Sequence, residues 1–227
     1  MPRRLNVYFL EDDMKSRRIK RLFDCIFGII LGIIAIPILI ITSIFVFICS
    51  PEASPIFRQV RVGYKGKEFA MLKLRTMTDQ RASNKELLPD EERLKWWGKL
   101  IRKTNIDELT QILHILAGQM SFIGPRPLLP KEMLVMTKKE QKKRQSVLPG
   151  IVGWESVNED KSSSRAEMAQ FDLYYVDNWS LRLDAKIFFL TIYHIFSFSR
   201  PDDSLRAPRL SEEEIKKAAE KEEIHRL

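Results

Sequence analysis

The sequence predicts a mainly helical α+β protein that is attached to a membrane. The stretch from Cys25 to Cys49 contains no charged side chain, which predicts a membrane helix. Residues 55–77 alternate between apolar and polar side chains around Gly63 and Gly66, which predicts a short β-hairpin. Apolar residues then recur at helical spacing, as in 106–116, so most remaining elements are expected to be helices around one compact cytosolic domain.

Length and charge set the broad class. The chain has 227 residues, a net charge of +8 and a pI of about 9.5, which favours an anionic partner such as phosphate, anionic lipid or nucleic acid. The two cysteines lie in the apolar stretch, where they are expected to act as small hydrophobic residues. The three histidines are scattered, so the sequence contains no zinc motif. We expect a basic segment at 1–21, a membrane helix at 22–50, a cytosolic domain at 51–200 and a charged tail at 201–227.

The apolar stretch is long enough to span a bilayer and too long for a cleavable signal sequence. Pro37 lies at its middle, where it removes the hydrogen bond to the Ile33 carbonyl and bends the helix. Basic residues flank both ends, and the positive-inside rule places both flanks in the cytoplasm. These observations predict a re-entrant helix that breaks at Ile36 and Pro37. The alternative is an ordinary kinked single span.

The second strand of the predicted hairpin carries Lys73 and Arg75. Two residues apart on a strand, these side chains point to the same face. A cationic face of this kind suits a diphosphate. The alternative is an ordinary solvated strand face.

Two adjacent acids, Asp107 and Glu108, are expected in the first turn of a helix. Thr104 stands three residues before Asp107, the spacing of a helix N-terminus, so Asp107 could be only the acid of a capping box. A single cap does not require the second acid. Neighbouring helical residues point about 100° apart, so the two acids can take different roles. A carboxylate can attack phosphorus, and Mg²⁺ is typically held by one or two carboxylates together with substrate phosphates.

Gly124-Pro125-Arg126-Pro127 presents an arginine between two prolines. Each proline fixes its own φ angle and pushes the residue before it out of the α region. Arg126 is therefore expected on a stiff, extended segment, and its guanidinium fork matches phosphate oxygens in pairs. The alternative is a surface turn with an incidental arginine.

The remaining segments fit a domain at a membrane surface. Residues 95–102 mix tryptophan with cations, which indicates an interfacial helix. Residues 181–198 could form a buried or an interfacial helix, and we favour the interfacial one. Residues 131–145 are expected to form a charged surface helix. Residues 165–178 are expected to be helical, with Asp172 and Asp177 as supporting acids. Ser211 and Glu214 predict a capping box in the tail.

Several motifs occur in the order found in the bacterial sugar transferases, the monotopic phosphoglycosyl transferases, and the chain resembles this family over about residues 16–192. The resemblance rests mainly on residues 102–111 and on the Gly-Pro-Arg-Pro segment at 124–127. The other matching segments are 57–63 (FRQVRVG), 73–77 (KLRTM), 149–154 (PGIVGW) and 175–181 (YVDNWSL).

The resemblance implies an enzyme of the bacterial inner membrane, integral and monotopic at the cytoplasmic face. Such an enzyme transfers a sugar 1-phosphate from a UDP-sugar to undecaprenyl (polyprenyl) phosphate and releases UMP, as the first membrane step of glycan or glycoconjugate biosynthesis. The implied route passes through a covalent aspartyl-phosphosugar intermediate on Asp107, with Glu108 helping to hold Mg²⁺. Membrane lipid is an expected partner, nucleic acid is not, and a homodimer is left open. The phosphate-binding residues implied by the match are Lys73, Arg75, Arg102, Arg126 and Pro127.

The sequence departs from the family pattern at two places. The helix break carries Ile36 where the family has serine before the proline, so one hydroxyl that satisfies the freed backbone is missing. The loop at 155–161 lacks the arginine that the family often places there, which leaves its sugar or uridine contacts open.

The competing interpretation is a non-catalytic, membrane-anchored basic protein that binds anionic lipid or nucleic acid. It accounts for the charge and for the apolar stretch. It does not account for two acids at the start of a helix together with an arginine fixed between prolines.

Overall fold

The structure is a computed structural model that describes residues 3–83, 85–158 and 165–196. It is mainly helical, as predicted, and the described residues contain two sheets of two strands each. Its longer helices are α1 (Arg3–Cys49), α3 (Trp96–Lys103), α7 (Arg165–Asn178) and α8 (Leu181–Phe196). Shorter helices are α2 (Asp90–Arg93), α4 (Gln111–Leu116), α5 (Lys138–Arg144) and α6 (Trp154–Asn158). The strands are β1 (Ile56–Val62), β2 (Glu68–Leu74), β3 (Ser121–Ile123) and β4 (Gly150–Val152), and 3₁₀ turns are η1 (Tyr64–Gly66), η2 (Ile106–Glu108) and η3 (Pro130–Val135).

The chain divides into two compact units, which are described separately. Unit 1 contains Met1–Asp24, Val60–Phe69 and Gly118–Leu227, and unit 2 contains Cys25–Gln59 and Ala70–Ala117. Helix α1 and the β1–β2 hairpin both run through the boundary between them. The proposed partition into segments 1–21, 22–50, 51–200 and 201–227 stays a prediction, and the tail with Ser211 and Glu214 lies outside the described residues.

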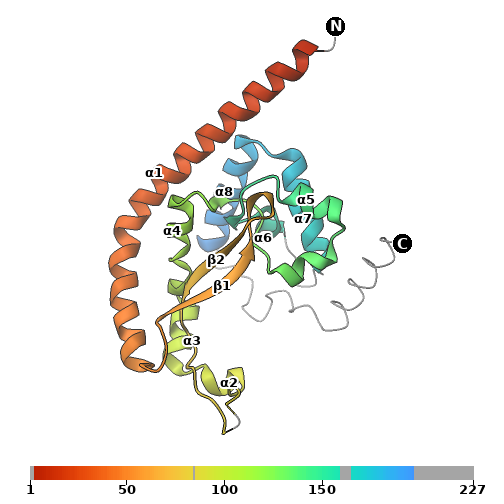
Figure 1. The fold of residues 1–227 in the computed structure, drawn as a ribbon. Coiled ribbons are helices and arrows are strands. Elements are labelled where there is room, and N and C mark those ends of the chain that lie inside the picture. The colour runs from red at the N-terminus through yellow and green to blue at the C-terminus, as the bar shows by residue number, and fades with distance from the viewer. Residues whose placement is uncertain (1–2, 84, 159–164, 197–227) are drawn as a thin grey trace, which may run out of the picture. The chain divides into compact units, whose positions relative to one another are not determined.

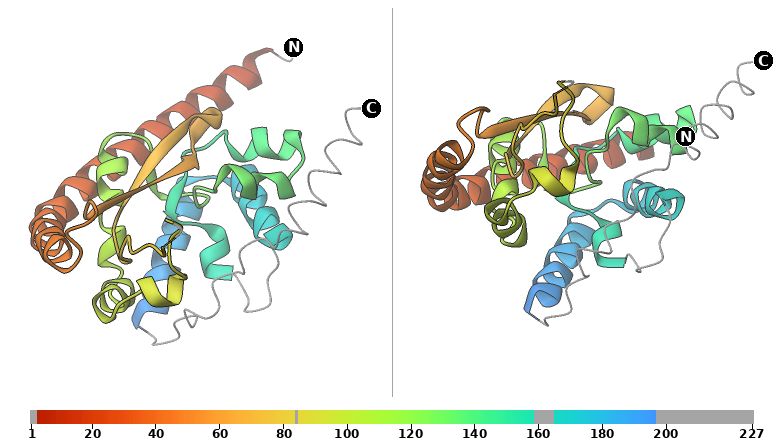
Figure 2. Two further views of the ribbon diagram at one scale, coloured as in Figure 1. Left: turned by 60° about the horizontal axis from the view of Figure 1, so that its bottom comes forward. Right: turned by 90° about the horizontal axis from the view of Figure 1, so that it is seen from below.

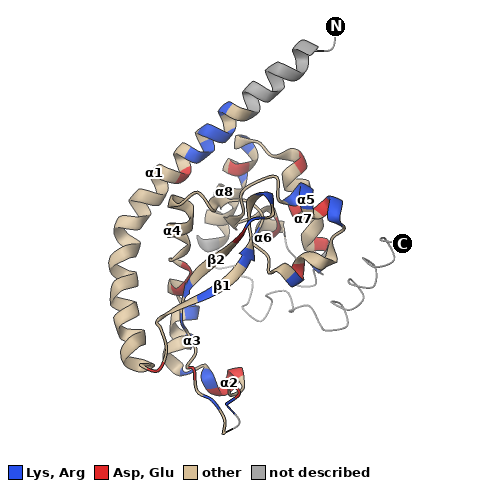
Figure 3. Cartoon of the chain, viewed as in Figure 1, with Lys and Arg blue, Asp and Glu red and all other residues tan. Residues whose placement is uncertain are grey.

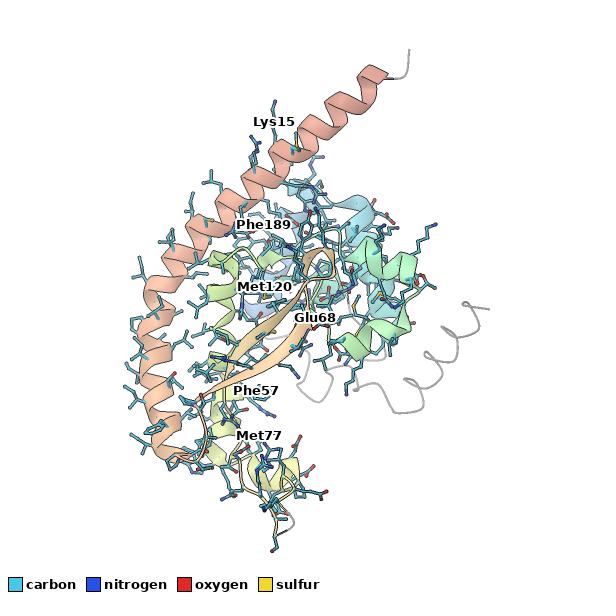
Figure 4. The ribbon with its side chains drawn as sticks, in the orientation of Figure 1. Lys15, Phe57, Glu68, Met77, Met120 and Phe189 are labelled. Atoms are coloured by element: carbon cyan, nitrogen blue, oxygen red, sulfur yellow. The ribbon has the colours of Figure 1, made fainter. Side chains whose placement is uncertain are left out.

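Helix α1 is one long helix that continues through Pro37, and its second part, residues 25–49, is apolar. Met14–Cys49 is long and apolar enough to cross a membrane, and Figure 3 shows that the charged residues of α1 give way to a stretch without charge. Its side chains project outward along the helix (Figure 4), and large apolar ones such as Ile33, Ile41 and Ile48 are 68–71% exposed. In water such exposure would be costly, so this helix fits an apolar environment. The break at Ile36 and Pro37 into a re-entrant hairpin stays a prediction.

In unit 2, helices α3 and α4 lie along residues 25–49 of α1 (Figure 1). Trp97 and Ile101 of α3 are buried against Val46, and Phe45 meets Trp96 edge-to-face with ring centroids 6.4 Å apart. Gly28 permits a close approach, because a Cβ there would lie 2.9 Å from a methyl of Leu116 in α4. The segment that precedes and follows the acid pair is thus packed on the apolar helix itself.

Helix α3 has two distinct faces, as the mixture of tryptophan and cations predicts. Trp97 and Ile101 face the core, whereas Trp96 and Leu100 are 70% and 53% exposed. In α8, Ile187 is fully buried while Phe189 and Tyr193 are each 67% exposed. These exposed aromatic and apolar side chains are the kind that lie at a membrane interface.

In unit 1, β3 and β4 pair in parallel, with Ser121 opposite Gly150 and Ile123 opposite Val152. The pair packs on α6, α7 and α8 through a core of Ile123, Val147, Tyr175 and Ile187. The views in Figure 2 show α7 beside α5. This core fixes the Gly124–Pro127 segment, which follows β3 directly.

The prediction of one surface helix over 131–145 is wrong in two respects. The chain forms the η3 turn, breaks, and then forms α5 from a Thr137 cap that accepts a hydrogen bond from the Glu140 N–H. Glu132 and Arg144 are also buried rather than exposed. They can be buried because each has charged partners from segments distant in the sequence, a relation that composition does not reveal.

Gly124 lies where the strand pair admits no side chain. A Cβ at Gly124 would lie 2.5 Å from the Leu148 carbonyl oxygen and 3.1 Å from the Gly150 nitrogen. We expect Gly124→Ala to lower the free energy of unfolding by about 1–3 kcal/mol, the usual cost of overpacking a core. Thermal unfolding of the purified protein measures this, with Gly32→Ala as control, because a methyl there meets its nearest atoms at 3.8 Å. Equal melting temperatures for the two variants would contradict the close packing at Gly124.

Candidate active site

The acid pair lies in a 3₁₀ turn between two helices and not in the first turn of a long helix. Asn105 adopts a left-handed conformation with φ of 54°, which ends α3 and starts η2. Asparagine tolerates this region better than most residues. The Thr104 hydroxyl donates back to the Leu100 and Ile101 carbonyls, each at 3.0 Å, and does not cap the turn that follows. The capping box of Thr104 and Asp107 is therefore wrong, and capping does not explain Asp107.

The turn is held against strand β2 by two hydrogen bonds to one residue. The Thr110 hydroxyl donates to the Leu72 carbonyl at 2.5 Å, and the Leu72 N–H donates to Nε2 of His114 at 2.9 Å. His114 is buried, and its Nε2 acts here as a hydrogen-bond acceptor for the backbone. These bonds fix the register between β2 and the acid pair.

This register brings Lys73 and Arg102 to the acids. Lys73 Nζ lies 2.9 Å from Oε1 of Glu108, and both side chains are partly buried. Burial raises the pKa of Asp107, and the neighbouring Glu108 carboxylate raises it further, while the positive charges of Lys73 and Arg102 oppose the shift. Arg102 is oriented by its Nε, which donates to the Thr76 hydroxyl at 2.9 Å. The two carboxylates are therefore half-buried, and the positively charged side chains of Lys73 and Arg102 lie beside them.

Arg75 has a different setting. It follows the last residue of β2, and its Nε donates to the Ser54 carbonyl at 2.7 Å while Nη1 lies 3.8 Å from Asp79. Its guanidinium also stands over the Phe57 ring, 6.0 Å from the centroid. The structure therefore pairs Lys73, and not Arg75, with the acids, although both were predicted on one strand face.

In unit 1 hydrogen bonds to the backbone fix the Gly124–Pro127 segment. Every carbonyl from residue 125 to 128 accepts one. The donors are, in order, the Gly150 N–H at 2.9 Å, Nη2 of Arg144 at 2.5 Å, Nη1 of Arg61 at 3.0 Å and the Val62 N–H at 2.9 Å. Pro125 and Pro127 are fully buried, whereas the Arg126 side chain is exposed. Arg126 takes part in no ion pair with the described residues. The segment thus presents one guanidinium on a fixed backbone.

Comparison with known proteins places these features in one family. The model of the bacterial sugar transferase family matches residues 15–198. The chain belongs to the bacterial sugar transferase family. This sugar transferase is 45% identical over 174 residues to the uncharacterized sugar transferase EpsL of Bacillus subtilis, covering 77% of this chain and 85% of that protein.

Other relatives carry more specific names. The UDP-glucose:undecaprenyl-phosphate glucose-1-phosphate transferase of Klebsiella pneumoniae is 35% identical over 186 residues, which cover 78% of this chain but only 40% of that protein. The exopolysaccharide production protein ExoY of Sinorhizobium fredii is 32% identical over 192 residues, covering 76% of this chain and 83% of that protein. Family membership makes this chain a transferase and removes the non-catalytic alternative.

Sequence reasoning missed the residues that hold the arginine segment of this sugar transferase. Arg144 reaches the Arg126 carbonyl from a buried ion pair with Asp172, whose Oδ2 lies 2.7 Å from the arginine Nε. Arg61 is likewise paired with Glu132 at 3.4 Å. Asp172 was predicted as a supporting acid and does support Arg144, whereas Asp177 pairs with the exposed Lys143 at 2.6 Å. Of the two arginines, only Arg61 had a sequence signal, since it belongs to the FRQVRVG motif.

A second acid, Glu155, is buried beside the ion pair of Arg144 and Asp172. Burial raises the pKa of Glu155 to about 8, and the charge of Asp172 and a hydrogen bond to it contribute further, while Arg144 opposes the shift. Burial raises the pKa of Asp172 as well, against the effect of Arg144. The two carboxyl groups share one arginine, and burial favours the neutral form of both.

The raised pKa of Glu155 predicts a pH-dependent stability. Its folded pKa exceeds its ordinary value of 4.5, so its stabilising effect is complete below that value and is lost as the pH rises towards 8. We expect the wild type to lose at least about 1 kcal/mol, or roughly 2–4 °C in melting temperature, between pH 6 and pH 9. Glu155→Gln cannot ionise and should lose less. Glu91→Gln, at an exposed acid of α2, serves as control. An unchanged pH dependence in Glu155→Gln would contradict the raised pKa of Glu155.

Proposed function

We propose that this sugar transferase moves a sugar 1-phosphate from a UDP-sugar to undecaprenyl phosphate and releases UMP. The observation that carries the proposal is a half-buried pair of acids, with Lys73 and Arg102 beside it, built on helices packed against an apolar helix. One substrate is soluble and the other is held in the bilayer by its tail, so the reaction needs such a site at a membrane surface. The name of the Klebsiella pneumoniae relative describes the same type of transfer with UDP-glucose.

The proposed chemistry has two displacement steps at phosphorus. A carboxylate oxygen of Asp107 attacks the phosphorus that bears the sugar, a new O–P bond forms, and the bond to the UMP oxygen breaks, so UMP leaves with the electron pair. A phosphate oxygen of undecaprenyl phosphate then attacks the same phosphorus and displaces Asp107 as a free carboxylate. The products are UMP and a lipid diphosphate-sugar, and the enzyme returns to its starting state.

The charged residues supply the electrostatic part of this mechanism. Phosphoryl transfer depends mainly on positioning and on neutralising phosphate charge. Lys73 and Arg102 stand beside the acids, where they also keep Asp107 more easily ionised than burial alone would allow. Arg126 is proposed to bind a phosphate through its fork, with Pro127 fixing its backbone. Arg75 is proposed to contribute positive charge for the substrate phosphates.

Mg²⁺ is the proposed cofactor, with Glu108 as the protein ligand. The neighbouring carboxylates fit this ion, because Asp107 and Glu108 repel one another and a divalent cation would relieve that repulsion. Within residues 3–83, 85–158 and 165–196, no three His, Cys, Asp or Glu side chains converge to form a metal site. A site with one or two carboxylates that is completed by substrate phosphates is the usual arrangement for Mg²⁺, which would neutralise charge on the diphosphate.

A covalent adduct on Asp107 tests the route. We expect intact-protein mass spectrometry after exposure to a UDP-sugar, without lipid acceptor, to show a phosphosugar mass on the wild type. Asp107→Asn should show no adduct and should lose turnover, because a neutral amide is a poor nucleophile. The control is Asp90→Asn, a change of the same chemistry at an exposed acid of α2. Full activity in Asp107→Asn would refute the assignment, and an active wild type without adduct would indicate direct transfer between the substrates.

The membrane arrangement is proposed to be monotopic at the cytoplasmic face of the bacterial inner membrane. The basic flanks on both sides of the uncharged stretch and the central Pro37 support a re-entrant helix, and the exposed aromatic residues of α3 and α8 support interfacial helices.

Cysteine labelling from each side of the membrane tests this topology. On a background without Cys25 and Cys49, cysteines placed at residues 8 and 65 should both label from the cytoplasmic side. In Pro37→Ala, which restores the helix hydrogen bond, a fraction of molecules should instead expose one of these positions on the other side. Labelling of positions 8 and 65 from opposite sides in the parent protein would establish a single span.

A further inference from the structure

Glu155 is the first residue of the loop in which the sequence departs from its family, and this acid is buried. It stands in the first turn of α6, and only 7% of its surface is exposed. Its carboxyl group lies against Gly153, where any Cβ would overlap Oε2. The Ser156 hydroxyl donates to Oε1 at 3.3 Å and accepts from the Gly153 N–H at 3.3 Å. Local contacts therefore hold this acid in the interior of unit 1.

Three helices bring charged groups together around this acid. Arg144 of α5 and Asp172 of α7 form an ion pair at 2.7 Å, with side chains that are 3% and 6% exposed. Glu155 is hydrogen-bonded to Asp172. From α8, Lys186 approaches α6 at the Trp154 ring, 5.2 Å from its centroid. Two buried carboxyl groups thus share a single guanidinium.

One oxygen of each carboxyl group lacks a donor. Oε2 of Glu155 and Oδ1 of Asp172 are buried, and neither accepts from an N–H or hydroxyl group of the residues that the structure describes. A buried acceptor without a donor is costly, and two ionised carboxylates accept hydrogen bonds but do not donate them. A single proton shared between the two groups would remove both costs and would leave one negative charge beside Arg144.

Arg144 links the two acids to the arginine that the proposed reaction uses. Its Nε donates to Asp172, and its Nη2 donates to the Arg126 carbonyl at 2.5 Å. A carboxylate is a stronger acceptor than a carbonyl, so a second negative charge on the acids would draw the guanidinium away from Arg126. The backbone of Arg126 is therefore held best when the two acids carry one charge between them.

We propose that Glu155 is a positioning residue for Arg126, because it shares a proton with Asp172 and so keeps Arg144 on the Arg126 carbonyl. Loss of this proton weakens the binding of the sugar donor. The inference rests on the proposed role of Arg126 in binding substrate phosphate. Burial raises the pKa of Glu155 to about 8, so the affinity for the donor falls between neutral and alkaline pH.

Donor binding to the purified full-length protein tests the inference. Every protein carries Asp107→Asn, so the donor binds without reacting and the shifted pKa of Asp107 makes no contribution. The probe is UDP-glucose, the donor in the name of the Klebsiella pneumoniae relative, and its diphosphate keeps the same charge throughout. Isothermal titration calorimetry with Mg²⁺ is run at about pH 6.5 and about pH 8.5, on either side of the Glu155 pKa. We expect the dissociation constant to rise about threefold between them, of the order that weakening one hydrogen bond gives.

Two substitutions at position 155 separate the proton from the side chain. In Glu155→Gln the amide donates to Asp172 at every pH, so the dissociation constant should change less than about 1.5-fold between the two pH values. Glu155→Ala has no donor, so it should bind UDP-glucose about threefold more weakly already at the lower pH. A purely structural role of Glu155 would lower the fraction of protein that binds, and not its affinity.

Asp177→Ala is the matched control. Asp177 pairs with Lys143 at 2.6 Å and joins the same helices, α7 and α5, at an exposed position. Its removal should leave both the affinity and the pH dependence as they are. The same pH dependence with Glu155 and with Glu155→Gln would overturn the proposal, and so would an unchanged affinity in Glu155→Ala.

Arg126→Ala separates this inference from the proposed function. We expect it to weaken UDP-glucose binding at least about tenfold, because the guanidinium fork is lost. If it does so while the variants of Glu155 have no effect, the inference fails and the phosphate role of Arg126 stands. If Arg126→Ala binds UDP-glucose as tightly as before, the phosphate role is refuted and the inference falls with it.

Discussion

The hydrogen bonds of a single strand residue organise the candidate active site. Leu72 offers its carbonyl to Thr110 and its N–H to His114, so the edge of the hairpin is tied to the segment that carries the acids. The same segment continues into α4, whose Leu116 packs closely on Gly28 of the apolar helix. Lys73 is the next residue of the strand, and this register brings its Nζ to 2.9 Å from Oε1 of Glu108. Strand register, acid position and membrane helix are thus fixed by one set of contacts.

The second constraint is the immobilised backbone around Arg126. Four consecutive carbonyls are each satisfied, two of them by arginines that are themselves held by buried carboxylates. Because this backbone is already fixed, binding of a ligand by the Arg126 side chain costs no further backbone entropy, which favours oriented phosphate binding. The cost is a set of buried charges, and the same burial raises the pKa of the neighbouring Glu155, which favours its neutral form.

Local patterns in the sequence predicted the features that depend on local physics. The apolar helix, the hairpin and the helix at 165–178 all appear where the sequence predicted them, because each depends on residues that are close together in the chain. The start of a helix at Thr104 was wrong, since Asn105 takes a left-handed conformation that the Thr-x-x-Asp spacing does not reveal. Arg144 was taken for a surface cation because its partner Asp172 is 28 residues away and its acceptor is a backbone carbonyl. Long-range pairing of this kind leaves no periodic signal.

The central claim is that the acids at the apolar helix transfer a phosphosugar from a soluble donor to a lipid acceptor. The most direct measurement follows UMP release and label transfer together, using a panel of sugar-labelled UDP-sugars with undecaprenyl phosphate and Mg²⁺. At least one UDP-sugar should give UMP and an equal amount of label in the organic phase, and both products should require the lipid acceptor for turnover. Label that stays in the aqueous phase with every UDP-sugar, from a folded and membrane-bound enzyme, would contradict this claim.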